Sequence, residues 1–265
     1  MSILLIDGLN LIRRVHAGVP EVSEDRDDAV LNACVASMRR ALRRHLPSHA
    51  LLVMEEAGPS WRSREYPDYK KNRPPMPDDL SAALPKIKDA LCEIGVHELA
   101  APGFEADDVI ASIANRTSDS GLQVVILSTD KSFCQLVSDR ITLVDHFNNT
   151  VCDRAWIQNR YGVAPEQVAD LMSLAGDTSL GIPGIRSVGV RTAARLIGEF
   201  GNLDAVIAHA DDIPGKLGEK LREGIDTLPL MHRLVSLRQD VQLGANLHDF
   251  RWSEKMLTAS IGEAG

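Results

Sequence analysis

Short apolar runs that end in an acidic residue are the feature that most limits how this chain can fold. Such runs end at Asp7, Glu55 and Asp130, and stretches with apolar residues at helical spacing, such as 29–46 and 80–94, lie between them. Buried strands that alternate with amphipathic helices predict an α/β fold with a mostly parallel sheet. The carboxyl ends of parallel strands meet at one edge of the sheet, where open α/β folds bind their ligands. We therefore expect these acids to lie close together.

The pattern changes near residue 150. Further strands are expected at 123–127 and 141–144, but from residue 155 onward short helical stretches alternate with Gly and Pro. We therefore expect an α/β domain at 1–150 and an α-helical region at 151–265.

Segment 61–79 interrupts the alternation of strands and helices. It is rich in Arg, Lys, Tyr and Pro and has no apolar period, so we expect it to be long and exposed. A run of charge is usually only a solvated surface. Here cations and aromatic residues are interleaved in an otherwise acidic protein, which suits phosphate contacts and base stacking on single-stranded nucleic acid.

A further group of acids opens the helix expected near residue 106. Glu105, Asp107 and Asp108 fall in its first turn, where the helix dipole alone favours acidic side chains. Their convergence with the acids at the strand ends indicates more, because neighbouring carboxylates repel one another unless a divalent cation neutralises them. Hard oxygen ligands suit Mg²⁺ or Mn²⁺. A site of this kind usually catalyses phosphoryl transfer or phosphodiester hydrolysis.

Composition excludes several classes of protein. Asp and Glu outnumber Lys and Arg by 37 to 29, giving a net charge of -8, which excludes a histone-like or polybasic partner role. No apolar run approaches the roughly 18 residues of a membrane helix, and the N-terminus is expected to form a buried strand rather than a signal peptide. The four cysteines are far apart, unlike those of a zinc site or a disulfide framework, so we expect reduced thiols in a cytoplasmic protein.

An ordered set of motifs resembles the bacterial 5′-nuclease and flap endonuclease family, in particular its stand-alone exonuclease IX branch. The resemblance extends from Leu4 to about Leu243. In chain order, its motifs are Asp7-Gly8 with Arg14, Tyr69-Lys70 with Arg73, Gly103-Phe-Glu-Ala-Asp-Asp108, Ser128-Thr-Asp-Lys131, Leu174-Ala-Gly-Asp177 and Ile182-Pro-Gly-Ile-Arg-Ser-Val-Gly-Val-Arg-Thr-Ala193. One motif alone would be weak evidence, but the ordered set is specific.

The resemblance implies a fold and a function. The fold is a PIN-like α/β nuclease core, a helical arch at about 61–85 over the site, and a helix-hairpin-helix at about 165–200 that grips duplex DNA. The function is Mg²⁺-dependent hydrolysis of DNA phosphodiesters at 5′ flaps or 5′ overhangs during replication or repair, by a monomer with no membrane partner.

The resemblance also implies roles for individual residues. Lys70, Arg73 and Asp107 would be catalytic. The first metal site would comprise Asp7, Glu55, Glu105, Asp107 and Asp108, and the second Asp130 and Asp177. K⁺ would bind to the main-chain carbonyls of Leu174, Ala175, Pro183, Ile185 and Val188. DNA would contact Arg14, Gly184, Ile185, Arg186, Ser187, Val188, Gly189, Arg191 and Thr192.

The chain departs from the family pattern at four positions. Ser132 and Leu180 stand where fuller members carry acids of the second metal site, so the second ion is expected to bind weakly or only together with DNA. Glu55 replaces the usual Asp. Ser187 replaces a hairpin glycine, which strains the turn if the position requires a positive φ.

Two alternatives remain open at this point. The chain could be a DNA-junction binding protein that has lost useful hydrolysis along with the second metal ion. It could also be a PIN-type RNA nuclease, a function that explains the acids but leaves the duplex-gripping hairpin without a purpose. Cleavage of a labelled 5′-flap DNA beside a matched RNA hairpin, with Mg²⁺ and with EDTA, separates the three.

Overall fold

A six-stranded sheet forms the centre of the computed structural model, which describes residues 1–21 and 25–259. Its strand order is β3-β2-β1-β4-β5-β6, and all neighbours are parallel except the last pair. The strands are β1 (Ser2–Asp7), β2 (His49–Val53), β3 (His97–Leu99), β4 (Gln123–Leu127), β5 (Ile141–Asp145) and β6 (Thr150–Cys152). The predicted parallel sheet is confirmed. β3 and β6 were not predicted, because three residues are too few to show a period.

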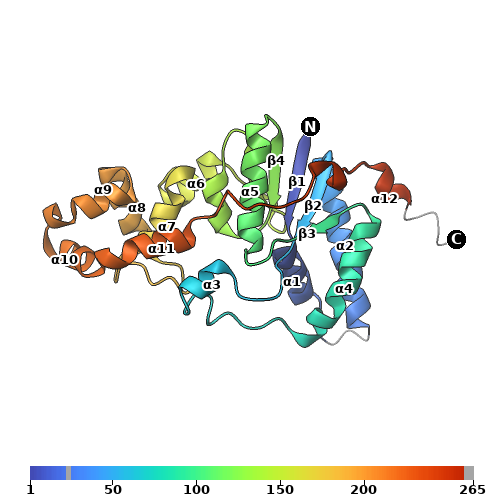
Figure 1. Cartoon of the computed structure of the whole chain (residues 1–265), viewed down its shortest axis with the longest axis horizontal. Coiled ribbons are helices and arrows are strands. Elements are labelled where there is room, and N and C mark those ends of the chain that lie inside the picture. The colour runs from blue at the N-terminus through green and yellow to red at the C-terminus, as the bar shows by residue number, and fades with distance from the viewer. Residues whose placement is uncertain (22–24, 260–265) are drawn as a thin grey trace.

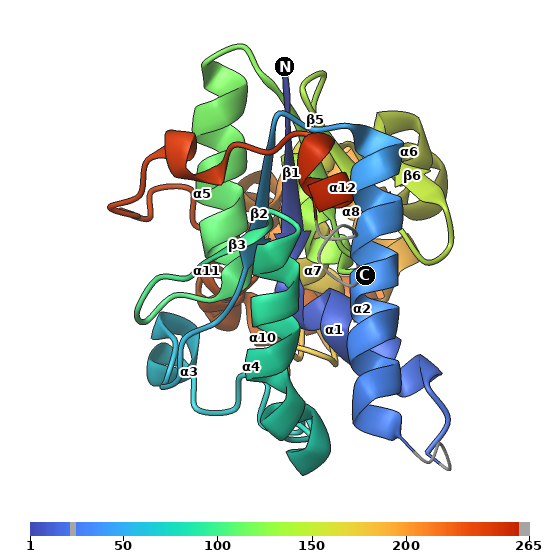
Figure 2. The same cartoon turned by 90° about the vertical axis from the view of Figure 1, so that its right-hand side faces the viewer.

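Helices cover both faces of the sheet. These are α1 (Gly8–Gly18), α2 (Arg26–His45), α4 (Asp78–Glu93) and α5 (Ala106–Asp119), together with the short α3 (Trp61–Glu65). Figure 2 shows α5 on one side of the sheet and α2 with α4 on the other. The predicted helices at 29–46 and 80–94 are thus confirmed with small shifts at their ends.

The second half of the chain is helical after β6. It contains α6 (Arg154–Tyr161), α7 (Val168–Ala175), α8 (Val190–Phe200), α9 (Leu203–Ala208), α10 (Gly215–Gly224), α11 (Leu228–Val235) and α12 (Lys255–Ala259), with 3-10 turns between several of them. In Figure 1 the region from α8 to α10 extends away from the sheet, while α12 returns to its far side.

Two apolar cores stabilise this arrangement, one on each face of the sheet. Residues such as Leu4, Met38 and Ile87 join β1, α2 and α4 on one face. On the other face the core around Val109 and Ile126 continues without a break into the helical region. Because burial of apolar side chains is the main favourable contribution to folding, this shared core holds the helical region against the nuclease-like domain.

Segment 61–79 is not the fully exposed segment that its composition predicts. Arg62 is only 1% exposed and Tyr69 only 6% exposed. Their partners lie on α5, more than 30 residues away in sequence, so no local pattern reveals their burial. From α3 the chain runs through turns to α4 (Figure 1).

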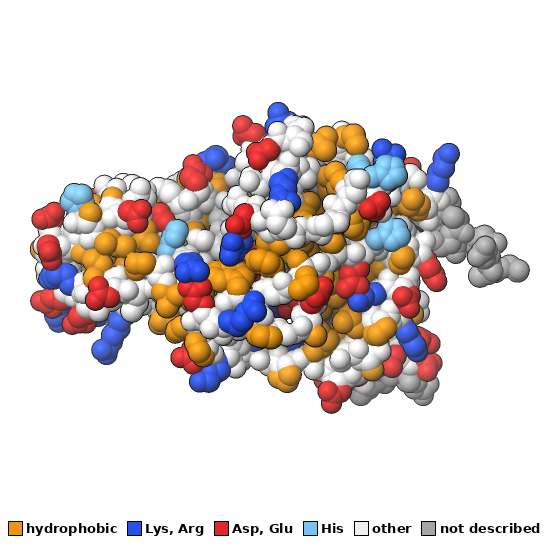
Figure 3. All heavy atoms as spheres, viewed as in Figure 1, with side chains coloured by type: hydrophobic (Ala, Val, Ile, Leu, Met, Phe, Trp, Pro, Cys, Tyr) orange, Lys and Arg blue, Asp and Glu red, His pale blue; other side chains and the backbone are white. Residues whose placement is uncertain are grey.

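The surface on the side shown in Figure 3 carries acidic and basic side chains interspersed. No helix in the described part of the chain is long and apolar enough to cross a membrane.

Candidate active site

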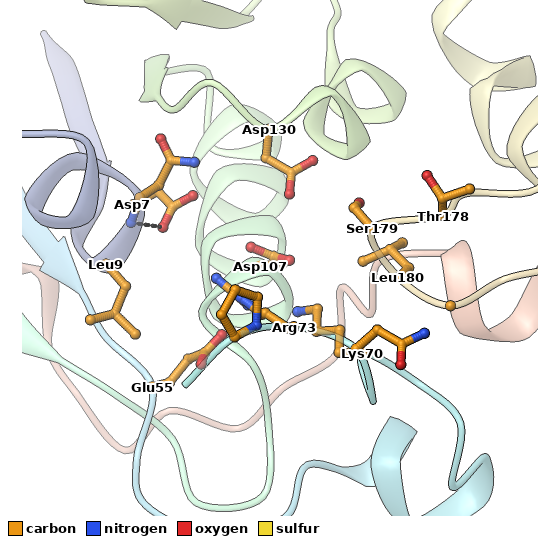
Figure 4. Close-up of a pocket in the computed structure, with 14 residues that line it drawn as sticks. Asp7, Leu9, Glu55, Lys70, Arg73, Asp107, Asp130, Thr178, Ser179 and Leu180 are labelled. Atoms are coloured by element: carbon orange, nitrogen blue, oxygen red, sulfur yellow. Dashed lines mark hydrogen bonds between the residues drawn. The ribbon is translucent and has the colours of Figure 1, made fainter. Parts of the chain in front are cut away.

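A pocket of about 350 Å³ opens at the carboxyl edge of the sheet. Six of the residues singled out from the sequence line it: Asp7, Glu55, Lys70, Arg73, Asp107 and Asp130. The segment from Thr178 to Gly181 forms its opposite wall. In Figure 4 the carboxylates of Asp7, Asp107 and Asp130 are directed towards a common space. The expected gathering of acids from the strand ends is therefore present.

Asp7 is fixed by the junction between β1 and α1. It is the N-cap of α1 and accepts a hydrogen bond of 3.3 Å from the backbone N–H of Asn10. The hydroxyl of Ser128, just after β4, donates a second bond of 2.7 Å to its other oxygen. Gly8 permits the tight junction, because a Cβ there would lie 2.9 Å from the carbonyl oxygen of Val53. Asp7 therefore has little freedom to move.

The pocket is electrostatically unfavourable for bare carboxylates. Burial, followed by the charges of Asp130 and Glu55, raises the pKa of Asp7 to about 6, although the hydrogen bond from Ser128 lowers it. Burial also raises the pKa of Asp107 well above its usual value, and Asp130 is the next largest cause. A positive charge placed between these acids would stabilise their ionised forms.

The donor chemistry of the pocket fits a hard divalent cation. Mg²⁺ prefers oxygen ligands and usually keeps several waters while it binds one or two carboxylates and substrate phosphates. Within the described residues, no group of three or more His, Cys, Asp or Glu side chains is arranged to hold a metal ion. The carboxylates of the pocket therefore suit an ion whose remaining ligands are water and phosphate oxygens.

Lys70 reaches the pocket through an unusual backbone conformation. Its φ is 52°, and its N–H donates a 2.9 Å hydrogen bond to the carbonyl oxygen of Leu180. Gly181 allows this contact, because a Cβ there would lie 2.5 Å from the carbonyl oxygen of Asp68. The Lys70 ammonium is 2.7 Å from Glu105. The turn at 66–73 is thus docked on the segment after α7, within the helical region.

Glu105 and Asp108 face a buried cation. Arg62 donates two hydrogen bonds of 2.7 Å to the carboxylate of Asp108 and one of 2.8 Å to Glu105. Asp108 is completely buried and accepts further bonds from Trp61 and from the backbone of Arg238. The sequence-based grouping placed Asp108 with the first metal ligands, but its side chain does not line the pocket that Asp107 lines.

Glu105 lies between the buried Arg62 and Lys70, which lines the pocket. Both of its oxygens are hydrogen-bonded, one to Lys70 and the other to Arg62 and Tyr69. Burial alone would raise its pKa, but the charges of Lys70 and Arg62 outweigh it and hold the pKa below its usual value. Glu105 is therefore ionised and positions Lys70 beside the pocket.

Sequence reasoning missed Arg62. Besides its two acidic partners, its guanidinium donates to the backbone carbonyls of Leu234 at 2.7 Å and Ser236 at 3.0 Å. It also lies 4.5 Å from the ring centroid of Trp61. Arg62 thus connects α3, α5 and the chain after α11. No signal in the sequence separates it from the exposed arginines of the same segment.

The structure brings some of the residues expected in the second metal site to one pocket, but does not arrange them as a set of free carboxylates. Asp130 lines the main pocket and also an adjoining one of about 420 Å³, which Ser132 and Asp177 share. One oxygen of Asp177 already accepts bonds from the backbone of Ser179 and Leu180. Leu180 is 7% exposed and belongs to a small apolar cluster, so an acid at this position would lose apolar packing.

In the predicted hairpin, the backbone around Gly176 packs against the backbone around Gly184. Gly176 and Gly184 have positive φ, and a Cβ on Gly184 would lie 2.3 Å from the backbone nitrogen of Gly176. The carbonyl of Leu174 accepts a 2.8 Å bond from the N–H of Ile185, and that of Ile185 accepts one from Val188. The five carbonyls proposed for K⁺ come from these two stretches and the turn after them, namely those of Leu174, Ala175, Pro183, Ile185 and Val188.

The expected DNA contacts of the hairpin lie around the start of α8. Arg186, Ser187, Gly189 and Arg191 are exposed, Gly184 and Thr192 are half-buried, and Ile185 and Val188 are buried. Ser187 has a φ of 65°, so the replacement of glycine does place a side chain in the left-handed region. Arg14 lies apart from this group, exposed on α1, with its guanidinium 5.6 Å from the ring of Phe147.

Comparison with known proteins agrees with this geometry. The family model of the 5′-3′ exonuclease N-terminal resolvase-like domain matches residues 2–162, and that of the 5′-3′ exonuclease C-terminal SAM fold matches residues 163–257. The chain therefore belongs to the 5′-3′ exonuclease family. Within it, the chain resembles curated proteins named Flap endonuclease Xni. One from Pectobacterium atrosepticum is 37% identical over 255 residues, covering 95% of both chains. Another from a Shewanella species is 40% identical over 248 residues, covering 94% of both.

Solved structures share the fold. The T5 D15 protein co-crystallised with metal ions superposes with a TM-score of 0.74 at 21% identity, covering 89% of each chain. The catalytic core of Rad2 in complex with DNA substrate gives a TM-score of 0.61 at 15% identity, covering 97% of this chain and 84% of that one. These likenesses confirm a PIN-like core with a helical SAM-like region.

Proposed function

We propose that this chain is a structure-specific 5′ flap endonuclease that hydrolyses DNA phosphodiesters with the help of Mg²⁺. One observation carries the proposal: four acids from separate elements converge on one pocket opposite Lys70 and Arg73. The relatives named flap endonucleases support the substrate, and the metal ions and DNA named for the structural neighbours support the chemistry and the partner.

Each group in the pocket has a distinct role in the proposed reaction. Asp7, Glu55, Asp107 and Asp130 surround the space in which a divalent ion would bind, directly to one or two of these carboxylates and through water to the others. When bound, the ion would supply an activated water and stabilise the negative charge of the phosphate in the transition state. Lys70 and Arg73 contact the phosphate that is cleaved. Glu105 and Asp108 act indirectly, through Lys70 and Arg62 respectively.

The helical region holds the duplex beside the pocket. In this proposal residues 1–150 carry the chemistry and residues 151–265 the duplex grip, with the hairpin amides around Gly184 and Gly189 on a phosphate. The hairpin carbonyls would hold K⁺, which would add positive charge beside a DNA phosphate. Comparing affinity in KCl and NaCl at equal ionic strength tests the K⁺ site. We also place the chain in the cytoplasm as a monomer, consistent with free cysteines among the described residues.

A second candidate function is favoured by one observation. Leu180 packs in an apolar cluster and Ser132 cannot replace a carboxylate, so the second metal site is incomplete. A chain with this defect could bind DNA junctions and hydrolyse them poorly. An RNA nuclease is less favoured, because it gives no role to the hairpin.

The decisive experiment compares cleavage of a labelled 5′-flap DNA with that of a matched RNA hairpin, each with Mg²⁺ and with EDTA. The flap endonuclease cuts the DNA near its junction, only with Mg²⁺, and leaves the RNA intact. Binding without turnover at any Mg²⁺ concentration would instead establish the junction-binding function, and preferential cleavage of the RNA would establish the third.

A further inference from the structure

A second pocket, distant in sequence from the catalytic residues, is lined by cations. It has a volume of about 450 Å³ and is formed by Arg40, Arg43 and Arg44 of α2 together with His146, Phe147 and Asn149 from the turn between β5 and β6. All three arginines are exposed, as is the ring of Phe147, which is 36% accessible. We call this site the arginine pocket.

The charge of the arginine pocket is not neutralised by the protein. The sequence of α2 contains no acid between Ala29 and His45. Among the described residues, none of the three arginines forms an ion pair; Arg44 bonds to Asn149, and Arg40 only weakly to Ser37 at 3.4 Å. Like charges held close together on one helix repel one another, so the three arginines are mutually unfavourable unless an anion neutralises them.

His146 forms the inner wall of the pocket. It is 9% exposed, and neither ring nitrogen has a hydrogen bond of normal geometry within the described residues, although the backbone of Ser37 lies beside the ring. Burial lowers the pKa of His146, and Arg40 and Arg44 lower it further, which places the ring within the positive field of the arginines. The pocket therefore combines the positive charge of the arginines with a histidine ring in its wall.

Arg14 links the arginine pocket to the candidate active site. Asn10 lines the active-site pocket, and Arg14 follows it by one turn on the same face of α1. The Arg14 guanidinium lies 5.6 Å from the ring centroid of Phe147, which lines the arginine pocket. Cations and an exposed ring thus continue from the edge of the active site onto α2.

We propose that the arginine pocket binds the sugar–phosphate backbone of the DNA substrate beyond the cleaved bond. The proposal rests on the nuclease function above. Arginine forks match phosphate oxygens in geometry as well as charge, and interleaved cations with an exposed aromatic ring suit a nucleic-acid strand. The site adds affinity without reading sequence, because phosphate contacts position a protein on DNA and base contacts specify it.

The test removes the three charges and measures how DNA affinity depends on salt. The variant Arg40→Gln/Arg43→Gln/Arg44→Gln is compared with the unchanged chain by fluorescence anisotropy in EDTA, over a series of KCl concentrations. Two flap substrates are used, one with long arms and one with arms too short to extend from the active-site pocket to the arginine pocket. With long arms, we expect the slope of log affinity against log salt to become shallower by up to about 2.7, at about 0.9 for each lost phosphate contact. With the short arms the slope stays unchanged.

Two control variants distinguish a site from a general charge effect. Lys86→Gln/Arg140→Gln/Arg251→Gln removes the same charge from exposed positions outside the pocket and should leave both slopes unchanged. Arg40→Lys/Arg43→Lys/Arg44→Lys keeps the charge and should retain most of the slope. Melting curves confirm that all variants fold.

The outcomes are separable from those of the nuclease proposal. An unchanged slope with long arms, or an equal change in the Lys86 control, would overturn the arginine pocket as a DNA site. The unchanged chain is assayed in parallel for cleavage of the long-arm flap with Mg²⁺. If the unchanged chain does not cleave this flap but the arginine variant still shows the expected change in slope, the nuclease function is refuted and the DNA site is supported.

Discussion

The charged guanidinium of Arg62 is buried, and its hydrogen-bond partners explain how the fold accommodates the charge. Its guanidinium is bonded to two carboxylates and two backbone carbonyls, which satisfy it almost completely. A buried ion pair adds little net stability, but removal of one partner leaves the other charge uncompensated and destabilises by about 3–5 kcal/mol. Arg62 is therefore a positioning residue, which fixes the α3 segment and its cations relative to α5.

A pair of neighbouring substitutions separates chemistry from structure at the residue scale. Asp107→Asn should abolish cleavage, because it removes a charge that holds the metal ion while hardly changing side-chain volume. Its melting temperature without metal should not fall, since Asp107 is half-buried among other acids and its pKa is raised. Asp108→Asn should instead lower the melting temperature, because it weakens the bonds from Arg62.

Both variants are measured by flap cleavage with Mg²⁺, by DNA binding in EDTA and by thermal melting. Binding should survive in Asp107→Asn. Cleavage at the unchanged rate by Asp107→Asn would show that the acids of the pocket do not hold the catalytic metal.

At the scale of elements, the important contact is the docking of the turn at 66–73 on the segment after α7. Gly181→Ala should disrupt it, because the new Cβ would lie 2.5 Å from the carbonyl oxygen of Asp68 and the residue has a φ of 72°. We expect a loss of stability above the roughly 1–2 kcal/mol of a left-handed conformation alone, and a lower cleavage rate because Lys70 is displaced.

Gly201→Ala is the matched control for this prediction. Gly201 has a φ of 97°, but a Cβ added there would meet no atom within 4 Å, so this substitution has only the conformational penalty. Urea unfolding gives the two stability losses, and single-turnover cleavage gives the rates. Equal losses of stability with unchanged cleavage in both variants would contradict the docking role of Gly181.

At the scale of the whole molecule, stability should depend jointly on pH and divalent metal. The pKa of Asp7 is about 6 in the folded protein against 3.8 as its ordinary value, and that of Asp107 is also raised. Such acids favour the folded state when protonated, so this contribution is full below about pH 4 and is lost as the pH rises through about 6. For Asp7 alone the loss is roughly 3 kcal/mol.

A divalent ion should offset this loss, because it binds the ionised carboxylates. The increase in melting temperature on replacing EDTA with MgCl₂ should therefore be larger at pH 8 than at pH 5. The difference between the two buffers isolates the pocket from other groups, such as His232, whose pKa is raised by its hydrogen bond to Asp170. An equal increase at both pH values would contradict metal binding by these acids.

The sequence by itself determined the alternation of the longer strands and helices, the edge of the sheet that carries the acids, and the family. These depend on local patterns: apolar runs long enough to show a period, acids directly after them, and acids in the first turn of a helix. Asp7, Glu55 and Asp130 could be predicted from the strand ends and Asp107 from the helix start, and the structure brings all four to one pocket.

Only the tertiary structure decided which charges face the pocket and which face one another. Adjacent residues on a helix point about 100° apart, so Asp107 and Asp108 look alike in sequence but enter different environments. Arg62 and Arg64 look alike in sequence, yet Arg62 is buried because its partners come from α5 and from the C-terminal end of α11. The arginine pocket likewise exists only because the turn after β5 packs beside α2. Long-range contacts of this kind depend on packing between elements distant in sequence, so the spacing of residues along the chain does not reveal them.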